Sequence, residues 1–320
     1  MVEESYPRDL MELEAQFATE GACQAYLAAL RWPAGFRCPG CGSGKAWPVR
    51  TLWECGQCGR QTSVTAGTIF QDTRIPLPVW FRAMWWVTTQ KNGASALGLQ
   101  RVLGLKEYRT AWMMLHKLRH AMVRPGRDLL TGRIEVDECY VGGEEAGLPG
   151  RLNLEKSLVV VAAQEDGPGI GRIRMRQIAN ASAESLLPFV QDSVAPGSVI
   201  HTDGWLGYLP LESKGYEHEV TFLKGKKKKK TASELMPRVH RVISLLKRWL
   251  IGTHQGAISP KHLDYYLDEF TFRFNRRRSK SRGKLFFRLA QQAVSVDPIT
   301  YHGIVHPKPK KGKPQPIGAT

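Results

Sequence analysis

The sequence predicts a mixed α/β fold, preceded by a small cysteine-rich module and a helical segment, and three patterns predict it. Two Cys-x-x-Cys pairs lie between residues 38 and 58. Apolar residues recur at helical spacing from Pro76 to about Val123. After residue 126, alternating strands and helices follow one another, an order typical of a mixed sheet covered by helices.

The composition predicts a polyanionic partner. The 320 residues include 46 Lys and Arg against 29 Asp and Glu, a net charge of +17. With an isoelectric point near 9.8, this excess favours a nucleic acid over other partners. The sequence has no run of eighteen apolar residues, and its acidic start has no signal-peptide pattern, so we expect a cytoplasmic protein with no membrane contact.

The two cysteine pairs predict a structural zinc site. Each pair places two thiolates on a tight turn, and two such turns can close a tetrahedral site. Four protein ligands leave no open position for catalysis. A dithiol redox pair is the alternative, which no other feature favours. The four predicted ligands are Cys38, Cys41, Cys55 and Cys58, whereas Cys23 and Cys139 are expected to be buried thiols.

Helical periodicity predicts two short helices within residues 1–31 and three more between Pro76 and Met122. The last two, Ser95–Leu103 and Arg109 to about Met122, are joined by a short glycine turn and resemble a helix-turn-helix. A plain helical bundle fits the pattern as well, but the basic charge of the chain favours DNA binding. The candidate phosphate contacts are Arg109, Lys117 and Arg119.

The segment after residue 126 predicts the α/β domain. Strands are expected at 133–141, 157–163, 171–178, 198–202 and 219–223, with helices at 182–194 and from about Leu235. Asp137 lies on the first of these strands, between apolar neighbours, and Asp203 lies where the fourth should end. Two carboxylates at such positions are able to share hard divalent cations.

Several long motifs in this order resemble the ISXO-type insertion-sequence transposases, which are related to the eukaryotic Merlin elements. The resemblance covers nearly the whole chain. Besides the cysteine pairs, the matching segments are Val136-Asp-Glu-Cys-Tyr-Val-Gly-Gly143, His201-Thr-Asp-Gly-Trp205 with Tyr208, His240-Arg-Val-Ile-Ser244, Leu246-Lys-Arg-Trp-Leu-Ile-Gly-Thr-His254, Ser259-Pro-Lys-His-Leu263 and Tyr266-Leu-Asp-Glu-Phe-Thr-Phe-Arg-Phe-Asn-Arg-Arg277.

The resemblance implies an RNase H-like catalytic domain of the DDE type, with Asp137 and Asp203 as the first two metal ligands. In such enzymes the third ligand commonly lies seven residues before a Lys or Arg on one helix, which fits His240 with Lys247. Glu234 competes, because Arg241 follows it at the same spacing. A histidine ligand departs from the usual glutamate and would favour Mn²⁺ over Mg²⁺.

The implied function is that of a transposase, which binds terminal inverted repeats and uses divalent metal ions for DNA cleavage and strand transfer. Its partners would be transposon ends and target DNA, and paired ends imply a homo-oligomer in the prokaryotic nucleoid. Lys247 and Arg248 would contact DNA near the scissile phosphate. The alternatives are a catalytically inactive zinc-ribbon DNA-binding protein derived from a transposase, and a nuclease that cuts without joining.

We therefore expect four segments. Residues 1–72 should hold the N-terminal helices and the zinc ribbon, 73–126 the helical DNA-binding segment, 127–302 the catalytic domain, and 303–320 a basic disordered tail. The lysine run 226–230 and the arginines at 276–278 are expected to attract phosphates without sequence preference, although solubility explains the lysine run equally well.

Overall fold

The computed structural model describes residues 4–124, 126–142, 156–221 and 232–306. The chain forms two compact units: Met1–Gly126 with Arg276–Val305, and Arg127–Asn275 with His306–Thr320. The lysine run, the C-terminal tail from residue 307 and Gly143, the last residue of the matching motif that begins at Val136, lie outside the described residues. Among the described residues, no helix is both long and apolar enough to span a membrane.

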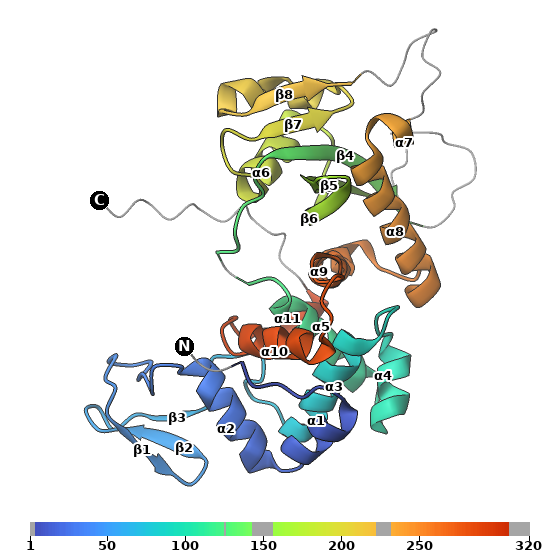
Figure 1. Ribbon diagram of the computed structural model, residues 1–320. Coiled ribbons are helices and arrows are strands. Elements are labelled where there is room, and N and C mark those ends of the chain that lie inside the picture. The colour runs from blue at the N-terminus through green and yellow to red at the C-terminus, as the bar shows by residue number, and fades with distance from the viewer. Residues whose placement is uncertain (1–3, 125, 143–155, 222–231, 307–320) are drawn as a thin grey trace. The chain divides into compact units, whose positions relative to one another are not determined.

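The first unit combines a three-stranded antiparallel sheet with a group of helices (Figure 1). Helices α1 and α2 begin at side-chain caps, where Asp9 and Thr19 each accept a backbone N–H of the first turn. Cys23 and Cys139 are buried free thiols, as expected. The elements are α1 Leu10–Gln16, α2 Glu20–Arg31, β1 Ala46–Val49, β2 Leu52–Cys55, β3 Gln61–Ser63, α3 Leu77–Thr89, α4 Ala96–Leu103, α5 Tyr108–Ala121, α10 Arg282–Ala293 and α11 Tyr301–Val305.

The three predicted helices α3, α4 and α5 are present. Ser95 caps α4 with its side chain, and Gly104 ends it in the left-handed conformation at φ 60°. The next helix starts four residues later, so α4 and α5 form the short helix-turn-helix connection that the sequence predicted. Trp80 and Trp85 are buried, as expected of core residues.

The second unit is built on a five-stranded mixed sheet with the order β6-β5-β4-β7-β8. Strands β4, β5 and β6 are antiparallel, whereas β7 and β8 run parallel to β4. The predicted mixed α/β fold is therefore confirmed. The elements are β4 Arg133–Val141, β5 Ser157–Asp166, β6 Gly169–Ile178, α6 Ala183–Ser193, β7 Val199–Thr202, η2 Leu206–Lys214, β8 Glu217–Val220, α7 Ala232–Leu235, α8 Pro237–His254, η3 Pro260–His262 and α9 Leu263–Asn275.

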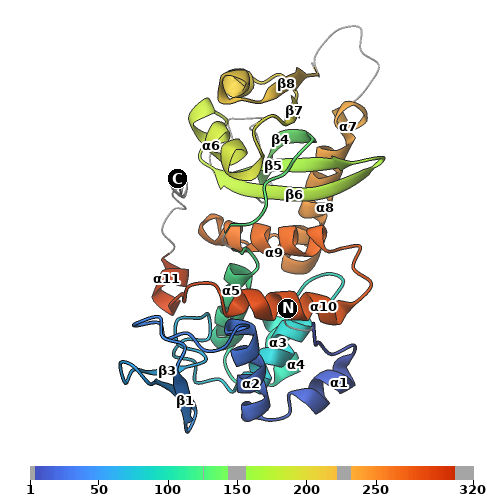
Figure 2. The ribbon, with the colours of Figure 1, turned by 60° about the vertical axis from the view of Figure 1, so that its left-hand side comes forward.

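Helices cover both faces of this sheet, and each face has its own core (Figures 1 and 2). On one face, Ile134 and Val136 of β4 pack with α6 and η2. On the other face, Val159 and Val161 of β5 pack with α8 and α9. The central strands are apolar on both sides because both sides are covered.

The second unit ends at Asn275, before the predicted end of the catalytic domain at 302. Helices α10 and α11 pack within the first unit instead, where Phe286 of α10 contacts the rings of Phe81 and Trp85 on α3. The chain thus returns to its N-terminal unit after the sheet domain is complete.

Candidate functional site

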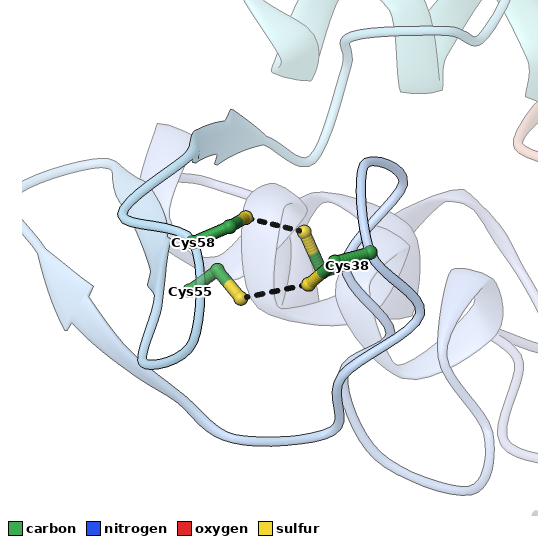
Figure 3. Close-up of side chains that lie close together, drawn as sticks. Cys38, Cys55 and Cys58 are labelled. Atoms are coloured by element: carbon green, nitrogen blue, oxygen red, sulfur yellow. Dashed lines mark hydrogen bonds between the residues drawn. The ribbon is translucent and has the colours of Figure 1, made fainter.

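The four cysteines of the first unit converge on one point. The Sγ atoms of Cys38 and Cys58 lie 3.6 Å apart, those of Cys41 and Cys55 lie 3.5 Å apart, and all four lie within 4.8 Å of one another. Figure 3 shows the thiols of the two turns facing each other. A tetrahedral site with Zn–S bonds of about 2.3 Å needs sulfur atoms about 3.8 Å apart. The donor set and its spacing therefore fit zinc.

Backbone N–H groups favour thiolates at this site. The N–H of Gly40 donates to Cys38 Sγ at 3.4 Å, and that of Gln57 donates to Cys55 Sγ at 3.5 Å. The N–H groups of Cys58 and Gln57 lower the pKa of Cys55 to about 6. Because the thiolate is the form that binds metal, these backbone contacts prepare Cys38 and Cys55 as ligands.

The core beneath the cysteines is small. Phe36 packs with Cys38 and Cys55, and the rings of Trp32, Phe36 and Trp53 contact one another. A core of this size does not stabilise a module by itself, so metal binding and folding are coupled. Strands β1 and β2 form an antiparallel hairpin that connects the two cysteine pairs.

The alternation of strand β4 divides its acidic residues between the two faces of the sheet. Glu135, Asp137 and Cys139 point to the face covered by α8, because successive side chains alternate and Cys139 packs in that core. Glu138 therefore points to the opposite face, toward α6 and η2. Of the adjacent pair Asp137 and Glu138, Asp137 shares a face with α8.

Asp203 directly follows the last residue of β7, the strand that pairs in parallel with β4. The parallel register pairs Ile134 with Ile200 and Glu135 with His201, and continuing it by two residues brings Asp203 beside Asp137. Neighbouring strands are about 4.8 Å apart. Gly204 turns the chain at φ 81°, and Asp203 Oδ1 accepts the N–H of Trp205 at 3.0 Å, which orients the carboxylate.

His240 on α8 reaches the same place. Its Nε2 lies 3.6 Å from Asp137 Oδ2, while Asp137 Oδ1 accepts the N–H of Glu138 at 2.8 Å. Burial lowers the pKa of His240, and the charges of Glu135 and Asp203 oppose that shift. The imidazole is therefore neutral at pH 7, the form that binds metal ions. Glu234, on α7, is exposed.

Lys247 and Arg248 are exposed on α8, two turns beyond His240. The Lys247 charge lies close enough to Cys139 to oppose the burial that raises the pKa of this thiol to about 12. Lys247 therefore flanks the strand that carries Asp137. The second site is looser than the first: among the described residues, the cysteines alone form a group of three or more ligand side chains within 4.8 Å.

The face of the sheet opposite α8 holds Tyr208, a residue for which no functional role was predicted. Tyr208 is fully buried, and burial raises its pKa well above the ordinary value. The carboxylates of Glu138, Asp137 and Asp203 raise it further, in that order, so the phenol remains protonated and lies behind the acidic site. The sequence indicated this tyrosine only by its place three residues after the His-Thr-Asp-Gly-Trp motif.

The predicted DNA contacts of the helical segment differ in exposure. Arg109 is exposed at the start of α5 and stacks over Tyr301 at 5.5 Å. Lys117 is buried, and its Nζ donates to the carbonyl of Ile69 at 3.0 Å. Arg119 is 2% exposed and donates to the carbonyl of Ala94 at 3.3 Å. Lys117 and Arg119 are thus corrected from phosphate contacts to internal contacts, because the covered face of α5 turns them inward.

Comparisons with known proteins match two parts of the chain. Residues 129–275 match the ISXO2-like transposase domain, and this range ends with the second unit. Residues 18–61 match the transposase zinc-ribbon domain and contain all four cysteines. The chain is 25% identical over 279 residues to an uncharacterized protein in transposable element ISH50 of Halobacterium salinarum, covering 80% of this chain and 91% of that protein. The two matched domains imply DNA as the partner. The chain therefore carries a transposase zinc-ribbon domain followed by an ISXO2-like transposase domain, and these two domains identify it as a transposase.

Proposed function

We propose that the second unit cleaves and joins DNA by metal-dependent phosphodiester chemistry, with Asp137, Asp203 and His240 as the metal ligands. The observation that supports this proposal is their placement: Asp137 lies on β4, Asp203 directly follows the parallel neighbouring strand β7, and a nitrogen of His240 lies 3.6 Å from Asp137. These residues are far apart in the sequence, and nothing in the sheet itself requires two carboxylates to be adjacent.

The chemistry of the three side chains fits a divalent ion. His240 Nε2 is buried and, within the part of the chain that the structure describes, has no hydrogen-bond partner. A buried nitrogen without a partner is unfavourable unless a ligand completes it. Two carboxylates with one neutral imidazole form a donor set that accepts Mn²⁺ and also Mg²⁺. Neither ion is distinguished by this geometry.

When bound, divalent ions activate a water or a DNA 3′-hydroxyl and stabilise the leaving 3′ oxygen. The protein's own contribution is positional. Asp137 in the middle of β4 and Asp203 directly after β7 supply negative charge, and Lys247 and Arg248 offer exposed cations to the DNA phosphates beside them. Cleavage and joining are both phosphodiester substitutions that differ in the nucleophile, so one site serves both steps.

We also propose that the first unit binds the terminal inverted repeats, with the zinc ribbon and the α4–α5 pair as its DNA-binding parts. In a helix-turn-helix, the N-terminal residues of the second helix enter the major groove. Here those residues are exposed and include Arg109. Two ends must be cut together, so we expect a homo-oligomer on DNA.

The experiment that tests the proposal is incubation of the full-length protein with labelled element ends and a target plasmid, in Mg²⁺ or Mn²⁺. Joined products are expected. Nicked ends without joined products would indicate a nuclease, and tight end binding without cutting in either metal would indicate a DNA-binding protein that has lost catalysis.

Replacing His240 is expected to change the metal requirement. His240→Ala should lower the cleavage rate about a hundredfold, because one ligand is lost. His240→Glu should regain part of this activity and shift it toward Mg²⁺, because carboxylate is a harder ligand. Initial cleavage rates across Mg²⁺ and Mn²⁺ titrations measure both effects. Equal cleavage rates for wild type and His240→Ala would contradict the assignment of His240 as a metal ligand and would favour Glu234 as the third ligand.

Arg109 and Lys117 are expected to respond in opposite ways. Arg109→Ala should weaken end binding and reduce the salt dependence of log K by about one unit, because one phosphate contact is lost. Lys117→Met should leave the salt dependence unchanged and lower the melting temperature, because two buried carbonyls lose their donor. Binding titrations at several salt concentrations, with thermal unfolding, separate the two. A smaller salt dependence for Lys117→Met would show that it does contact phosphate.

A further inference from the structure

Helix α8, which carries His240, begins without a cap of its own. Met236 makes no side-chain hydrogen bond at the N-cap position, and Pro237 at the first helical position has no N–H. The N–H groups of Arg238 and Val239 point out of the helix and need acceptors from elsewhere. The N–H of His240 is the first to bond in the helical pattern, to the carbonyl of Met236 at 3.4 Å.

Glu135 of β4 supplies both missing acceptors. Its Oε2 accepts the N–H of Arg238 at 2.8 Å and that of Val239 at 2.9 Å. Its Oε1 accepts from Arg238 Nη1 at 3.1 Å. Glu135 is only 1% exposed, and a carboxylate at a helix N-terminus also interacts favourably with the helix dipole. One buried side chain thus satisfies the whole first turn of α8.

Arg238 fixes the same turn to the neighbouring hairpin. Its Nη2 donates to Glu165 Oε1 at 2.6 Å and to the carbonyl of Gly167 at 2.9 Å, and its Nε donates to the carbonyl of Gly169 at 3.2 Å. These acceptors lie at the end of β5, in the turn after it and at the start of β6. The start of α8 is therefore held at two points of the sheet.

The contacts of Glu135 and Arg238 at the start of α8 lie close in sequence to the proposed metal ligands. Asp137 lies two residues beyond Glu135 on the same face of β4, and His240 directly follows Val239 on α8. We propose that Glu135 is a positioning residue, which holds α8 in register with β4 so that His240 and Asp137 ligate the same metal ion. This inference rests on the proposed function. A ligand displaced by about 1 Å loses much of its effect, so the register of the helix controls the site.

Comparing Glu135→Gln with Glu165→Gln tests the proposal. Both changes remove a carboxylate that accepts from the Arg238 side chain, but only Glu135 also accepts the two backbone N–H groups at the start of α8. Mn²⁺ binding to the DNA-free protein, followed by electron paramagnetic resonance, is the first readout. Glu135→Gln is expected to weaken it about tenfold or more, and Glu165→Gln less than about threefold. Cleavage should fall in parallel, with unchanged affinity for end DNA.

Thermal unfolding shows whether each variant is folded at the assay temperature. If Glu135→Gln is not folded, Glu135→Asp is tested in its place. Aspartate keeps the negative charge near Arg238, but its side chain is one methylene shorter and does not reach the start of the helix in the same way. Glu135→Asp should therefore also weaken Mn²⁺ binding about tenfold or more. Equal losses in the Glu135 and Glu165 variants, or Mn²⁺ binding as in wild type for a folded Glu135 variant, would overturn the inference alone. Wild-type protein that neither binds Mn²⁺ nor cleaves would overturn the proposed function and this inference together.

Discussion

Asp137→Asn is expected to abolish DNA cleavage and strand joining while leaving binding to the inverted repeats intact. The amide keeps the size of the side chain and removes the charge that faces His240, so metal binding is lost without a cavity or a clash. Losing a ligand of the catalytic metal removes about 4 kcal/mol of transition-state stabilisation or more, about a thousandfold in rate. Single-turnover cleavage of labelled ends measures the rate, and a gel-shift titration measures the binding.

Asp192→Asn is the matched control, because its carboxylate lies on α6 and pairs with Arg176 at 2.8 Å. It removes an aspartate charge from the same unit without touching the proposed ligands, so its cleavage rate should stay within about threefold of wild type, as expected for a partly exposed ion pair. Strand cutting by purified Asp137→Asn at a rate near wild type would refute its assignment as a ligand.

Cys38→Ser is expected to release the zinc and unfold the ribbon. A serine hydroxyl does not replace a thiolate ligand, and structural zinc contributes about 10 kcal/mol or more to folding a module of this kind. The small core of Phe36, Trp32 and Trp53 does not compensate for that loss. We expect zinc to fall from about one ion per chain to near zero, and end binding to fall about tenfold or more. Elemental analysis and binding titrations measure these changes.

Cys23→Ala separates this effect from the loss of any cysteine. Cys23 is buried on α2, and burial raises its pKa to about 12, so it is a neutral core thiol. Its replacement should leave the zinc content unchanged. A Cys38→Ser protein that is well folded, retains its zinc and binds ends as wild type does would show that the ribbon does not depend on this ligand.

The amino-acid sequence by itself determined the local structure and the chemistry of the cysteines. Strand β4 begins and ends at the predicted residues, and α4, α5 and α6 fall within one residue of prediction at each end, because side-chain periodicity and capping act over a few residues. Strand β8 begins at Glu217, two residues before the predicted start at 219, and residues 222 and 223 of the predicted strand lie outside the described residues. Its Glu-His-Glu-Val sequence lacks an apolar stripe, so its pairing with β7 places it.

The tertiary structure decided which of these residues share a site. The alternation of β4 separates Asp137 from Glu138, but only the packing of α8 shows which face receives His240. The inward direction of Lys117 depends on the carbonyl of Ile69, 48 residues away. No sequence motif indicated the role of Glu135, because its partners on α8 lie 103 and 104 residues further along the chain. Short-range patterns follow from backbone geometry, whereas the partners of a buried charge are set by which distant elements must pack together to exclude water.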